Sequence, residues 1–358
     1  MKLVTIVGAR PQFVKAAVVS RAIQDYNGRH GTAIDEVIVH TGQHFDANMS
    51  DVFFNEMQIP KPQYFLNING LSHGAMTGQM MQKIEVLLLR ESPDYVLVYG
   101  DTNSTLAGAL TASKLNIPVA HVESGLRSYN RQMPEEINRL LTDNLSTWLF
   151  CPSHQSIENL KREGIVDNST HQVIHSGDVM YDAVKFYKKD MRKPDFSVSE
   201  AFVLSTLHRA ENTDSKPRLT SIFKALKRIA SSIDLVLPLH PRTRKKLEDF
   251  QIDTGDIRIV DPVSYHEMLF LLSGCKIVMT DSGGLQKEAY FSHKPCVTLR
   301  DETEWVELVE HGYNSVAGTE DSDICDAYEK MRRVRVNTSA IYGNGEAGPK
   351  IVHHLLKG

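Results

Sequence analysis

Residues 94–123, DYVLVYGDTNSTLAGALTASKLNIPVAHVE, contain two short apolar runs separated by a helix-compatible stretch. The runs DYVLVYG and IPVAHVE are rich in valine and other strand-forming residues, as the buried strands of a parallel sheet are. A strand, a helix and a second strand in this order form a parallel βαβ unit. This stretch therefore predicts a doubly wound α/β fold.

Similar apolar runs recur along the rest of the chain. KLVTIVG, DEVIVH and WLFCPS belong to the first half, and the second half restarts the pattern with AFVLSTLH, DLVLPLH, IRIVD, KIVMTDS and PCVTLR. A chain of 358 residues is too long for one ordinary core. We therefore expect an amino-terminal domain of residues 1–176 and 345–358, a carboxyl-terminal domain of residues 177–344, and a ligand between the two halves. The polar segment 191–199, MRKPDFSVS, is typical of a junction between domains.

Composition excludes several classes of protein. The 40 basic and 44 acidic residues are spread along the chain and give a net charge of −4, so no basic face favours a nucleic acid. No apolar stretch approaches the length of a membrane span, and the amino terminus lacks the features of a secretion signal. The four cysteines are scattered, and no HxxxH or CxxC spacing indicates a metal site. We expect a reduced cytoplasmic protein whose chemistry needs neither a metal nor a cofactor.

The run KIVMTD leads directly into Ser282, Gly283 and Gly284 and then into the helix-like LQKEAYF. A glycine turn between a strand and a helix presents free backbone amides to an anion, so this is the best candidate for a diphosphate site. Glu288 is placed to accept hydrogen bonds from ribose hydroxyls. The alternative interpretation is that Asp281 and Ser282 only cap a helix and the glycines only make a turn.

The first loop, GARPQFVK, is a second candidate for an anion site. Pro11 suits the first turn of a helix, and Arg10 and Lys15 flank that helix start. Cations there oppose the helix dipole at a cost of about 0.3–1 kcal/mol per charge unless an anion neutralises them. The loop is neither a Walker A sequence nor GxGxxG, which favours a nucleotide without redox chemistry.

Three carboxylates are candidates for proton transfer. Asp101 and Glu123 each follow a predicted strand, so both reach one crevice if those strands are neighbours, and Glu135 joins them from a helix start. Asp101 could equally cap the helix that follows it. Glu135 could equally form an i,i+4 pair with Arg139, which is worth roughly 0.2–0.5 kcal/mol.

Two histidines end strands in the second half of the chain. His208 follows AFVLSTL, and His240 occupies the equivalent place after DLVLPL. A histidine at a strand end that faces the crevice can protonate or hold a leaving phosphate, although a lone histidine is usually structural. The equivalence of the two positions favours a functional interpretation for both.

Seven motifs, in the order GARPQFVKA, TGQH, GDTNSTLAG, HVESGLRS, MPEEINR, TLHRAEN and TDSGGLQKEA, carry a family resemblance. Over essentially the whole chain the sequence resembles the non-hydrolysing UDP-N-acetylglucosamine 2-epimerases. The resemblance implies two Rossmann-like doubly wound domains with a cleft between them, a glycosyltransferase-B-like arrangement. It also implies a homodimer that acts on a UDP-sugar without a tightly bound cofactor.

The same resemblance implies a mechanism: UDP is eliminated to leave a glycal and then re-adds after the sugar has turned its other face to the acids. By motif position, Asp101, Glu123 and Glu135 would transfer protons and His208 would assist the leaving diphosphate. The implied contacts to UDP and to the sugar are Arg10, Lys15, Arg139, His240, Ser282, Gly283, Gly284 and Glu288.

Two questions stay open at the level of sequence. The motifs look closest to the branch that acts on UDP-2,3-diacetamido-2,3-dideoxyglucuronate, whose carboxylate Arg242 or Arg244 could recognise, but UDP-N-acetylglucosamine is an equally good substrate candidate. Surface solvation accounts for these arginines equally well. A UDP-sugar glycosyltransferase of the same architecture is the alternative function.

Overall fold

The computed structural model describes residues 1–43, 54, 58–337 and 340–357. His44, the last residue of the TGQH motif, lies outside this set. The chain forms two compact units: unit 1 is Met1–Ala183 with Ala340–Gly358, and unit 2 is Val184–Ser339. The division falls inside helix α7 (Val179–Tyr187), and the segment 191–199 belongs to unit 2.

The described part of unit 1 contains a seven-stranded parallel sheet in the order β3-β2-β1-β4-β5-β6-β7. This is a doubly wound order, in which the chain reverses direction across the sheet between β1 and β4. The strands are β1 (Lys2–Val7), β2 (Asp35–His40), β3 (Tyr64–Phe65), β4 (Tyr95–Tyr99), β5 (Val119–Val122), β6 (Trp148–Cys151) and β7 (Gln172–His175).

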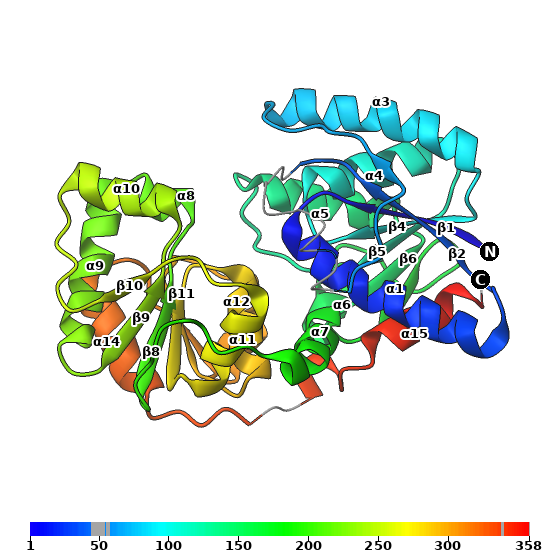
Figure 1. Ribbon diagram of the computed structural model, residues 1–358. Coiled ribbons are helices and arrows are strands. Elements are labelled where there is room, and N and C mark those ends of the chain that lie inside the picture. Colours follow the sequence, from blue (N-terminus) through cyan, green and yellow to red (C-terminus); the bar gives the residue numbers. More distant parts are fainter. Residues whose placement is uncertain (44–53, 55–57, 338–339, 358) are drawn as a thin grey trace. The chain divides into compact units, whose positions relative to one another are not determined.

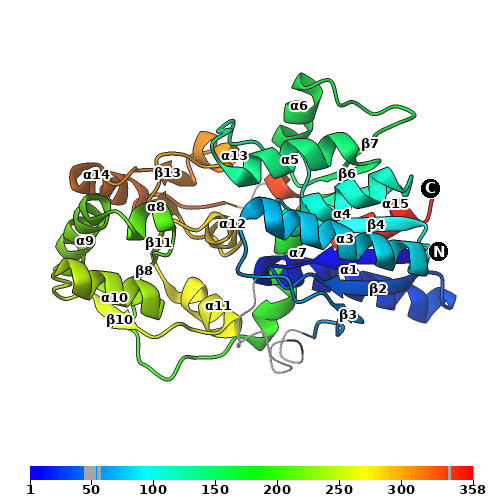
Figure 2. The same cartoon turned by 90° about the horizontal axis from the view of Figure 1, so that it is seen from above.

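Helices cover both faces of this sheet (Figures 1 and 2). On one face α3 packs on α4, and α4 packs on α5 (Figure 1). On the other face α15, near the end of the chain, packs along α1 (Figure 1). The helices of unit 1 are α1 (Arg10–His30), α3 (His73–Glu91), α4 (Asn103–Lys114), α5 (Pro134–Leu145), α6 (His154–Arg162), most of α7, the short η2 (Ala340–Tyr342) and α15 (Ala347–Leu355).

Helix α4 shows why the sequence folds in this way locally. Thr102 caps its start, because the threonine side chain accepts a hydrogen bond from the backbone N–H of Thr105. Small buried residues then bring the helix close to the sheet: a Cβ on Gly108 would lie only 2.9 Å from Cδ1 of Ile6. This close packing places the turn between β4 and α4 directly beside the end of β1.

The described part of unit 2 repeats the architecture with a six-stranded parallel sheet in the order β10-β9-β8-β11-β12-β13. The reversal here falls between β8 and β11. The strands are β8 (Phe202–Thr206), β9 (Asp234–Pro238), β10 (Arg258–Val260), β11 (Ile277–Thr280), β12 (Cys296–Thr298) and β13 (Asn314–Val316). The predicted α/β fold class with two doubly wound sheets is confirmed.

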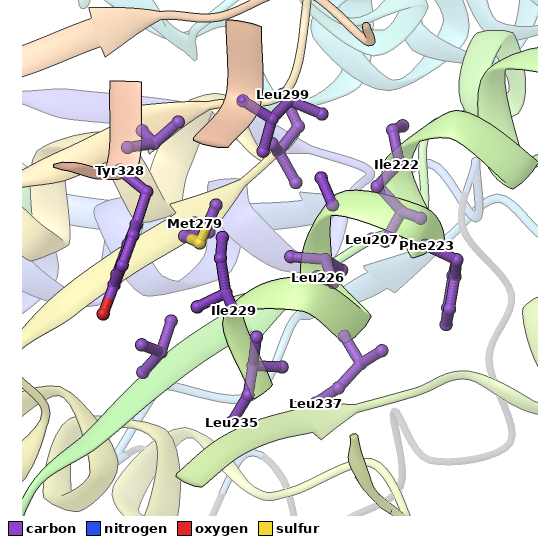
Figure 3. Packing of buried hydrophobic residues seen from close by; sticks show 14 of the residues in the cluster. Leu207, Ile222, Phe223, Leu226, Ile229, Leu235, Leu237, Met279, Leu299 and Tyr328 are labelled. Carbon is purple, nitrogen blue, oxygen red and sulfur yellow. The ribbon is translucent and has the colours of Figure 1, made fainter. Parts of the chain in front are cut away.

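The core of unit 2 lies between this sheet and the helices α9 and α14, which pack against each other. Figure 3 shows Leu226 and Ile229 of α9 on the side of the helix that faces Met279 and Leu235 of the strands. The helices of unit 2 are the end of α7, η1 (Lys188–Asp190), α8 (Ala210–Thr213), α9 (Lys216–Ala230), α10 (Pro241–Phe250), α11 (Tyr265–Gly274), α12 (Gly283–Phe291), α13 (Val306–Glu310) and α14 (Asp321–Met331).

No helix in the described ranges is both long enough and apolar enough to cross a membrane.

Candidate active site

Each sheet reverses its strand order once, and at that point the carboxyl ends of two strands part to leave room for a ligand. In unit 1 the reversal places the loop after β1 beside the turn after β4. In unit 2 it places the residues after β8 beside those after β11. Most of the predicted site residues lie at or near these two edges.

The loop after β1 is organised by Gln12, a residue that sequence analysis did not single out. Its Oε1 accepts hydrogen bonds from the backbone N–H groups of Gly8 (2.8 Å) and Ala9 (3.0 Å). Its Nε2 donates to the carbonyl oxygen of Tyr99 (2.7 Å) and to Oγ1 of Thr105 (3.0 Å). One buried amide therefore joins the first loop to the end of β4, which sets the position of Arg10 and Lys15 relative to Asp101.

Gly8 is required at the end of β1 by close approach. A Cβ there would lie 2.1 Å from Oγ of Ser104 and 2.2 Å from Oγ1 of Thr41. Arg10 begins α1 two residues after Gly8, and it is exposed. The predicted placement of Arg10 and Lys15 in the first turns of a helix is therefore present, where an anion would be favoured.

Glu123 directly follows β5, and its side chain forms an ion pair with Lys15 of α1. The Glu123 side chain is 5% exposed and that of Lys15 is 14% exposed, so the pair is largely removed from water. Glu123 has a backbone φ of +73°, a left-handed conformation that costs free energy for a residue other than glycine. Such strain persists where the surrounding structure holds it, and active sites are a frequent place for it.

Asp101 follows β4, which neighbours β5 in the sheet, so the condition for bringing Asp101 and Glu123 to one edge is met. Arg139 of α5 donates to Oδ2 of Asp101 from Nε (3.0 Å) and from Nη2 (2.6 Å). The Asp101 carbonyl oxygen accepts from Nδ2 of Asn138 (2.8 Å). Helix α5 therefore holds both the backbone and the carboxylate of Asp101.

Glu136, rather than Glu135, is the buried acid at the start of α5. Glu136 is 1% exposed and accepts from Nη1 of Arg139 (2.8 Å) and from the backbone N–H groups of Ser128 and Tyr129 (both 2.9 Å). Burial alone would raise the pKa of Glu136, but these hydrogen bonds hold it below its usual value. Glu136 is thus an ionised anchor for the loop after β5.

Glu135 occupies the adjacent position and is half-buried. It lies one helical turn before Arg139, so the two residues share a side of α5. Arg139 itself forms ion pairs with Asp101 and Glu136. The position of Glu135 on the helix therefore keeps it a candidate for proton transfer. The contacts described at this edge do not give it a role.

At the edge of unit 2 the key carboxylate is Asp281, which sequence analysis treated only as a possible cap. Asp281 has no exposed surface and follows β11. It accepts hydrogen bonds from the backbone N–H groups of His208 (3.1 Å) and Arg209 (2.9 Å) and from Nδ2 of Asn212 (3.3 Å). Asp281 thereby ties the end of β8 to the end of β11.

His208 also contacts Asp281 through its ring, with Nδ1 lying 3.2 Å from Oδ1. The ring is partly exposed, and its surroundings act on its charge in opposite directions. Desolvation lowers the pKa of His208 below its usual value, and the nearby positive charges of Arg209 and Arg300 lower it further. The Asp281 carboxylate raises this pKa and so opposes both effects, but the net shift is downward. An incoming polyanion would favour the protonated ring.

The turn after β11 begins α12 as predicted. Ser282 caps the helix by accepting from the backbone N–H of Leu285 (3.4 Å). A Cβ on Gly283 would lie 2.4 Å from Oε1 of Glu304, whereas a Cβ on Gly284 would meet no atom within 4 Å. A Cβ at 283 would therefore have to displace the Glu304 carboxylate, whereas the space beside the backbone at 284 is open.

The remaining predicted residues of unit 2 divide between the edge and the interior. His240 caps α10, and its Nδ1 accepts from the backbone N–H of Arg242 (3.2 Å). Glu288 is 8% exposed within the largely buried helix α12. Arg242 forms an ion pair with Asp214 (2.8 Å) and Arg244 forms one with Asp261 (3.0 Å), so both arginines take part in pairs on the protein surface.

Metal ligands do not cluster in the described ranges: no group of three or more histidine, cysteine, aspartate or glutamate side chains is arranged to hold an ion. What the two edges do offer is acid and base groups in unit 1 and anion-binding amides and a histidine in unit 2. The groups of unit 1 suit proton transfer, and those of unit 2 suit the binding of an anion.

Two parallel sheets, each with charged groups at its reversal point, define a pair of Rossmann-like, nucleotide-handling units. The family model described as UDP-N-acetylglucosamine 2-epimerase matches residues 28–356. The chain therefore belongs to the UDP-N-acetylglucosamine 2-epimerase family and is an isomerase of the UDP-sugar 2-epimerase type. The expected family and enzyme class are confirmed.

Individual relatives cover the whole chain. A UDP-2,3-diacetamido-2,3-dideoxy-D-glucuronate 2-epimerase from Pseudomonas aeruginosa is 51% identical over 360 residues, which cover 100% of both chains. A UDP-N-acetylglucosamine 2-epimerase from Methanocaldococcus jannaschii is 43% identical over 373 residues, again covering 100% of both. A crystal structure of the enzyme from that organism in complex with UDP-GlcNAc and UDP matches with a TM-score of 0.90, 42% identity and 100% coverage of both chains.

Proposed function

We propose that this enzyme inverts carbon 2 of a UDP-linked 2-acetamido sugar, by eliminating UDP and adding it back. The observation that carries the proposal is the pair of carboxylates at neighbouring strand ends of unit 1, each held by a cation from a helix: Glu123 by Lys15 and Asp101 by Arg139. One carboxylate can remove the carbon-2 proton while another delivers a proton to the opposite face.

In the elimination step, electrons move from the C–H bond at carbon 2 toward the diphosphate oxygen at carbon 1. A base takes the proton from carbon 2, the C–H electrons form a double bond to carbon 1, and the bond from carbon 1 to the diphosphate oxygen breaks. UDP leaves with that electron pair, and the glycal remains. Re-addition reverses these events: carbon 2 takes up a proton on its other face, and the diphosphate oxygen of UDP bonds to carbon 1 again.

In this proposal unit 2 supplies most of the groups for the leaving diphosphate, and Arg10 comes from unit 1. The open backbone beside Gly284, the helix start at Ser282 and the ring of His208 suit a diphosphate that gains negative charge as it departs. Glu288 would contact the ribose, and Arg10 and His240 would support the phosphates. Glu135 would join Asp101 and Glu123 in proton transfer.

For the sugar we propose UDP-2,3-diacetamido-2,3-dideoxyglucuronate, with UDP-N-acetylglucosamine as the second candidate. A 2-epimerase named for the first sugar is 51% identical to this chain, and one named for the second is 43% identical. We expect neither Arg242 nor Arg244 to recognise the sugar carboxylate, because each is engaged by an aspartate of unit 2.

One experiment tests reaction and substrate together. Each UDP-sugar is incubated separately with the enzyme in heavy water, and the products are followed by proton NMR. We expect the 2-epimer to appear with deuterium at carbon 2, faster for the diacetamido uronate. Sugar transfer to an added acceptor without deuterium at carbon 2 would instead identify a glycosyltransferase.

We also propose that the enzyme is a homodimer that works in the cytoplasm. Helices α3 and α5 expose large apolar side chains, with Val86 at 68%, Leu89 at 63% and Leu141 at 46% exposure, and such side chains commonly lie in an interface. The four cysteines are free thiols, which suits a reducing compartment. Sedimentation of wild type and of Leu89→Glu should give a dimer and a monomer; a wild-type monomer would contradict the dimer.

A further inference from the structure

A chain of four ionisable side chains runs from Glu163 into the interior of unit 1. Glu163 contacts Arg127 through Nε and Nη2 (2.8 and 2.6 Å), and Arg127 contacts Oδ2 of Asp143 through Nη1 (2.7 Å). Asp143 in turn contacts His121 of β5, with Oδ1 lying 2.7 Å from Nδ1. The side chains of His121, Asp143 and Arg127 have no exposed surface.

The ring of His121 is held from both sides by hydrogen-bond acceptors. Its Nδ1 faces the Asp143 carboxylate at 2.7 Å, and its Nε2 faces the carbonyl oxygen of Gly100 at 2.8 Å. A neutral imidazole donates from one nitrogen only, so either neutral form would press a ring lone pair against an oxygen lone pair. A doubly protonated ring satisfies both contacts.

The shared proton belongs on the ring rather than on Asp143. Burial alone would raise the pKa of Asp143, but the contacts with His121 and Arg127 hold it below its usual value. Oδ2 of Asp143 also accepts from the backbone N–H of Gly125 (3.1 Å). With Glu163 and Asp143 ionised, Arg127 and a protonated His121 bring the formal charge of the chain to zero, which lowers the cost of burying it.

We propose that His121 is a positioning residue of this enzyme, held as an imidazolium, which fixes the carbonyl of Gly100 and through it the turn that carries Asp101. This role rests on the proposed function of Asp101 and Glu123. His121 touches neither substrate nor the reacting atoms in the proposal, and it acts through the backbone alone.

The backbone around Gly100 shows how the contact with His121 would position Asp101. Gly100 has a φ of +61°, and its N–H donates to the carbonyl of Val122 (3.0 Å). Since its carbonyl oxygen contacts His121, both backbone polar groups of Gly100 are bound to β5. A Cβ on Gly100 would lie 3.3 Å from Oε2 of Glu123 and 3.6 Å from Nζ of Lys15. Releasing the Gly100 carbonyl would therefore let Asp101 move relative to the Lys15–Glu123 pair.

Two substitutions separate the two contacts of the ring. The amide nitrogen of glutamine reaches the place of Nε2, so His121→Gln keeps a donor for the Gly100 carbonyl. The amide nitrogen of asparagine reaches the place of Nδ1, so His121→Asn keeps a donor for Asp143 and frees Gly100. Since misplacement by about 1 Å can cost on the order of 100-fold, we expect His121→Asn to lower kcat about 100-fold and His121→Gln about 10-fold, with KM within about 3-fold in both.

The matched control is His171→Gln, which removes a side-chain contact with a backbone carbonyl in unit 1, because the glutamine amide does not reach the place of Nδ1. In wild type this nitrogen of His171 contacts the carbonyl of Ser146 (2.9 Å), ahead of β6. The control should leave kcat unchanged. Equal kcat for His121→Asn and wild type in the carbon-2 exchange assay, or a loss in KM alone, would overturn the positioning role.

The charge of the ring is tested without any activity measurement. Long-range proton–nitrogen correlation spectra of wild-type protein labelled with ¹⁵N-histidine should show both His121 nitrogens in the protonated range at pH 7, with the signals assigned from the His121→Gln spectrum. A pyridine-like nitrogen in that ring would overturn the imidazolium even if the enzyme is active. A protonated ring in a protein that exchanges no deuterium into either UDP-sugar would instead point to failure of the proposed function.

Discussion

The carboxyl edges of the two sheets use charge in opposite ways. In unit 1 the carboxylates of Glu123 and Asp101 are paired with cationic side chains, Lys15 and Arg139, that reach them from helices. In unit 2 the carboxylate of Asp281 is completely buried and is satisfied largely by backbone amides. The first edge presents acids, and the second uses its acid internally to shape a turn.

This difference shows that strand order locates a site but does not decide its chemistry. Both sheets reverse at an equivalent point, and both place polar residues after the strands that flank it. What each edge can do depends on whether the carboxylate meets a helix-borne cation or a backbone N–H group.

The largest effect is expected for Glu123→Gln. Removing a positioned base costs typically 10²–10⁴-fold, so kcat should fall about 1000-fold. Because the proposed diphosphate contacts lie mainly in unit 2 and do not include Glu123, the affinity for UDP measured by calorimetry should stay within about 2-fold of wild type. A folded variant with near-normal epimerisation would remove Glu123 from the proton-transfer groups, and a large loss of UDP affinity would break the division between the two edges.

Asp281→Asn should damage unit 2 and spare unit 1. The asparagine carries an amide donor where the carboxylate accepted, so a buried backbone N–H loses its partner at a cost of about 1–3 kcal/mol. Hydrogen exchange followed by mass spectrometry should speed up in peptides around His208 and the start of α12, and UDP should bind more weakly. Equal acceleration in β1 and β4 would show that the two edges are not separable in this way.

Acid should weaken unit 1 through His40. Burial lowers the pKa of His40 to about 4, so the folded protein keeps the ring neutral while the unfolded chain takes up a proton below about pH 6.5. The unfolded state then binds more protons, and the free energy of unfolding should fall by roughly 1–3 kcal/mol as the pH drops from about 6.5 to about 4. Denaturant titrations across this range should give a flatter profile for His40→Asn, whose oxygen can still accept from Gly42; an unchanged profile would exclude His40 as the source.

The smallest effect compares two adjacent glycines. Gly284→Ala meets no protein atom and sits in a helix, so the fold should be unharmed or slightly stabilised, by about 0.5–1 kcal/mol, while UDP affinity falls several-fold. Gly283→Ala is the matched variant, because its Cβ would collide with Glu304 and should lower the melting temperature. Unchanged UDP binding in Gly284→Ala would mean that the open space beside this residue is not the diphosphate site.

Most of the sheet was predictable because central strands of a parallel sheet are apolar on both faces. The runs around β1, β4, β5, β8 and β11 were recognised for this reason. The sequence pattern missed β3, β7 and β13, which are short strands at the edges of the two sheets and only partly buried. An edge strand buries less surface and needs no continuous apolar run.

Helix α5 shows where reading the pattern fails. Its apolar residues Ile137 and Leu141 are about half exposed, while Glu136, Arg139 and Asp143 on the opposite side are buried. The spacing of these three charges, at i, i+3 and i+7, is the signal that could have identified a charged buried stripe. Hydrophobicity alone assigns the wrong face to the interior, and it gives no reason to prefer Glu136 over Glu135.

The sequence by itself determined the family, the alternation of strands and helices, and the strand ends that Asp101, Glu123, His208 and Ser282 follow. Each of these depends on motifs or apolar runs formed by residues close together in the sequence. Only the tertiary structure decided the partners: Lys15 for Glu123, Arg139 for Asp101, and the carbonyl of Gly100 for His121. These contacts join residues far apart in sequence, and whether a charge is buried or solvated depends on what folds around it.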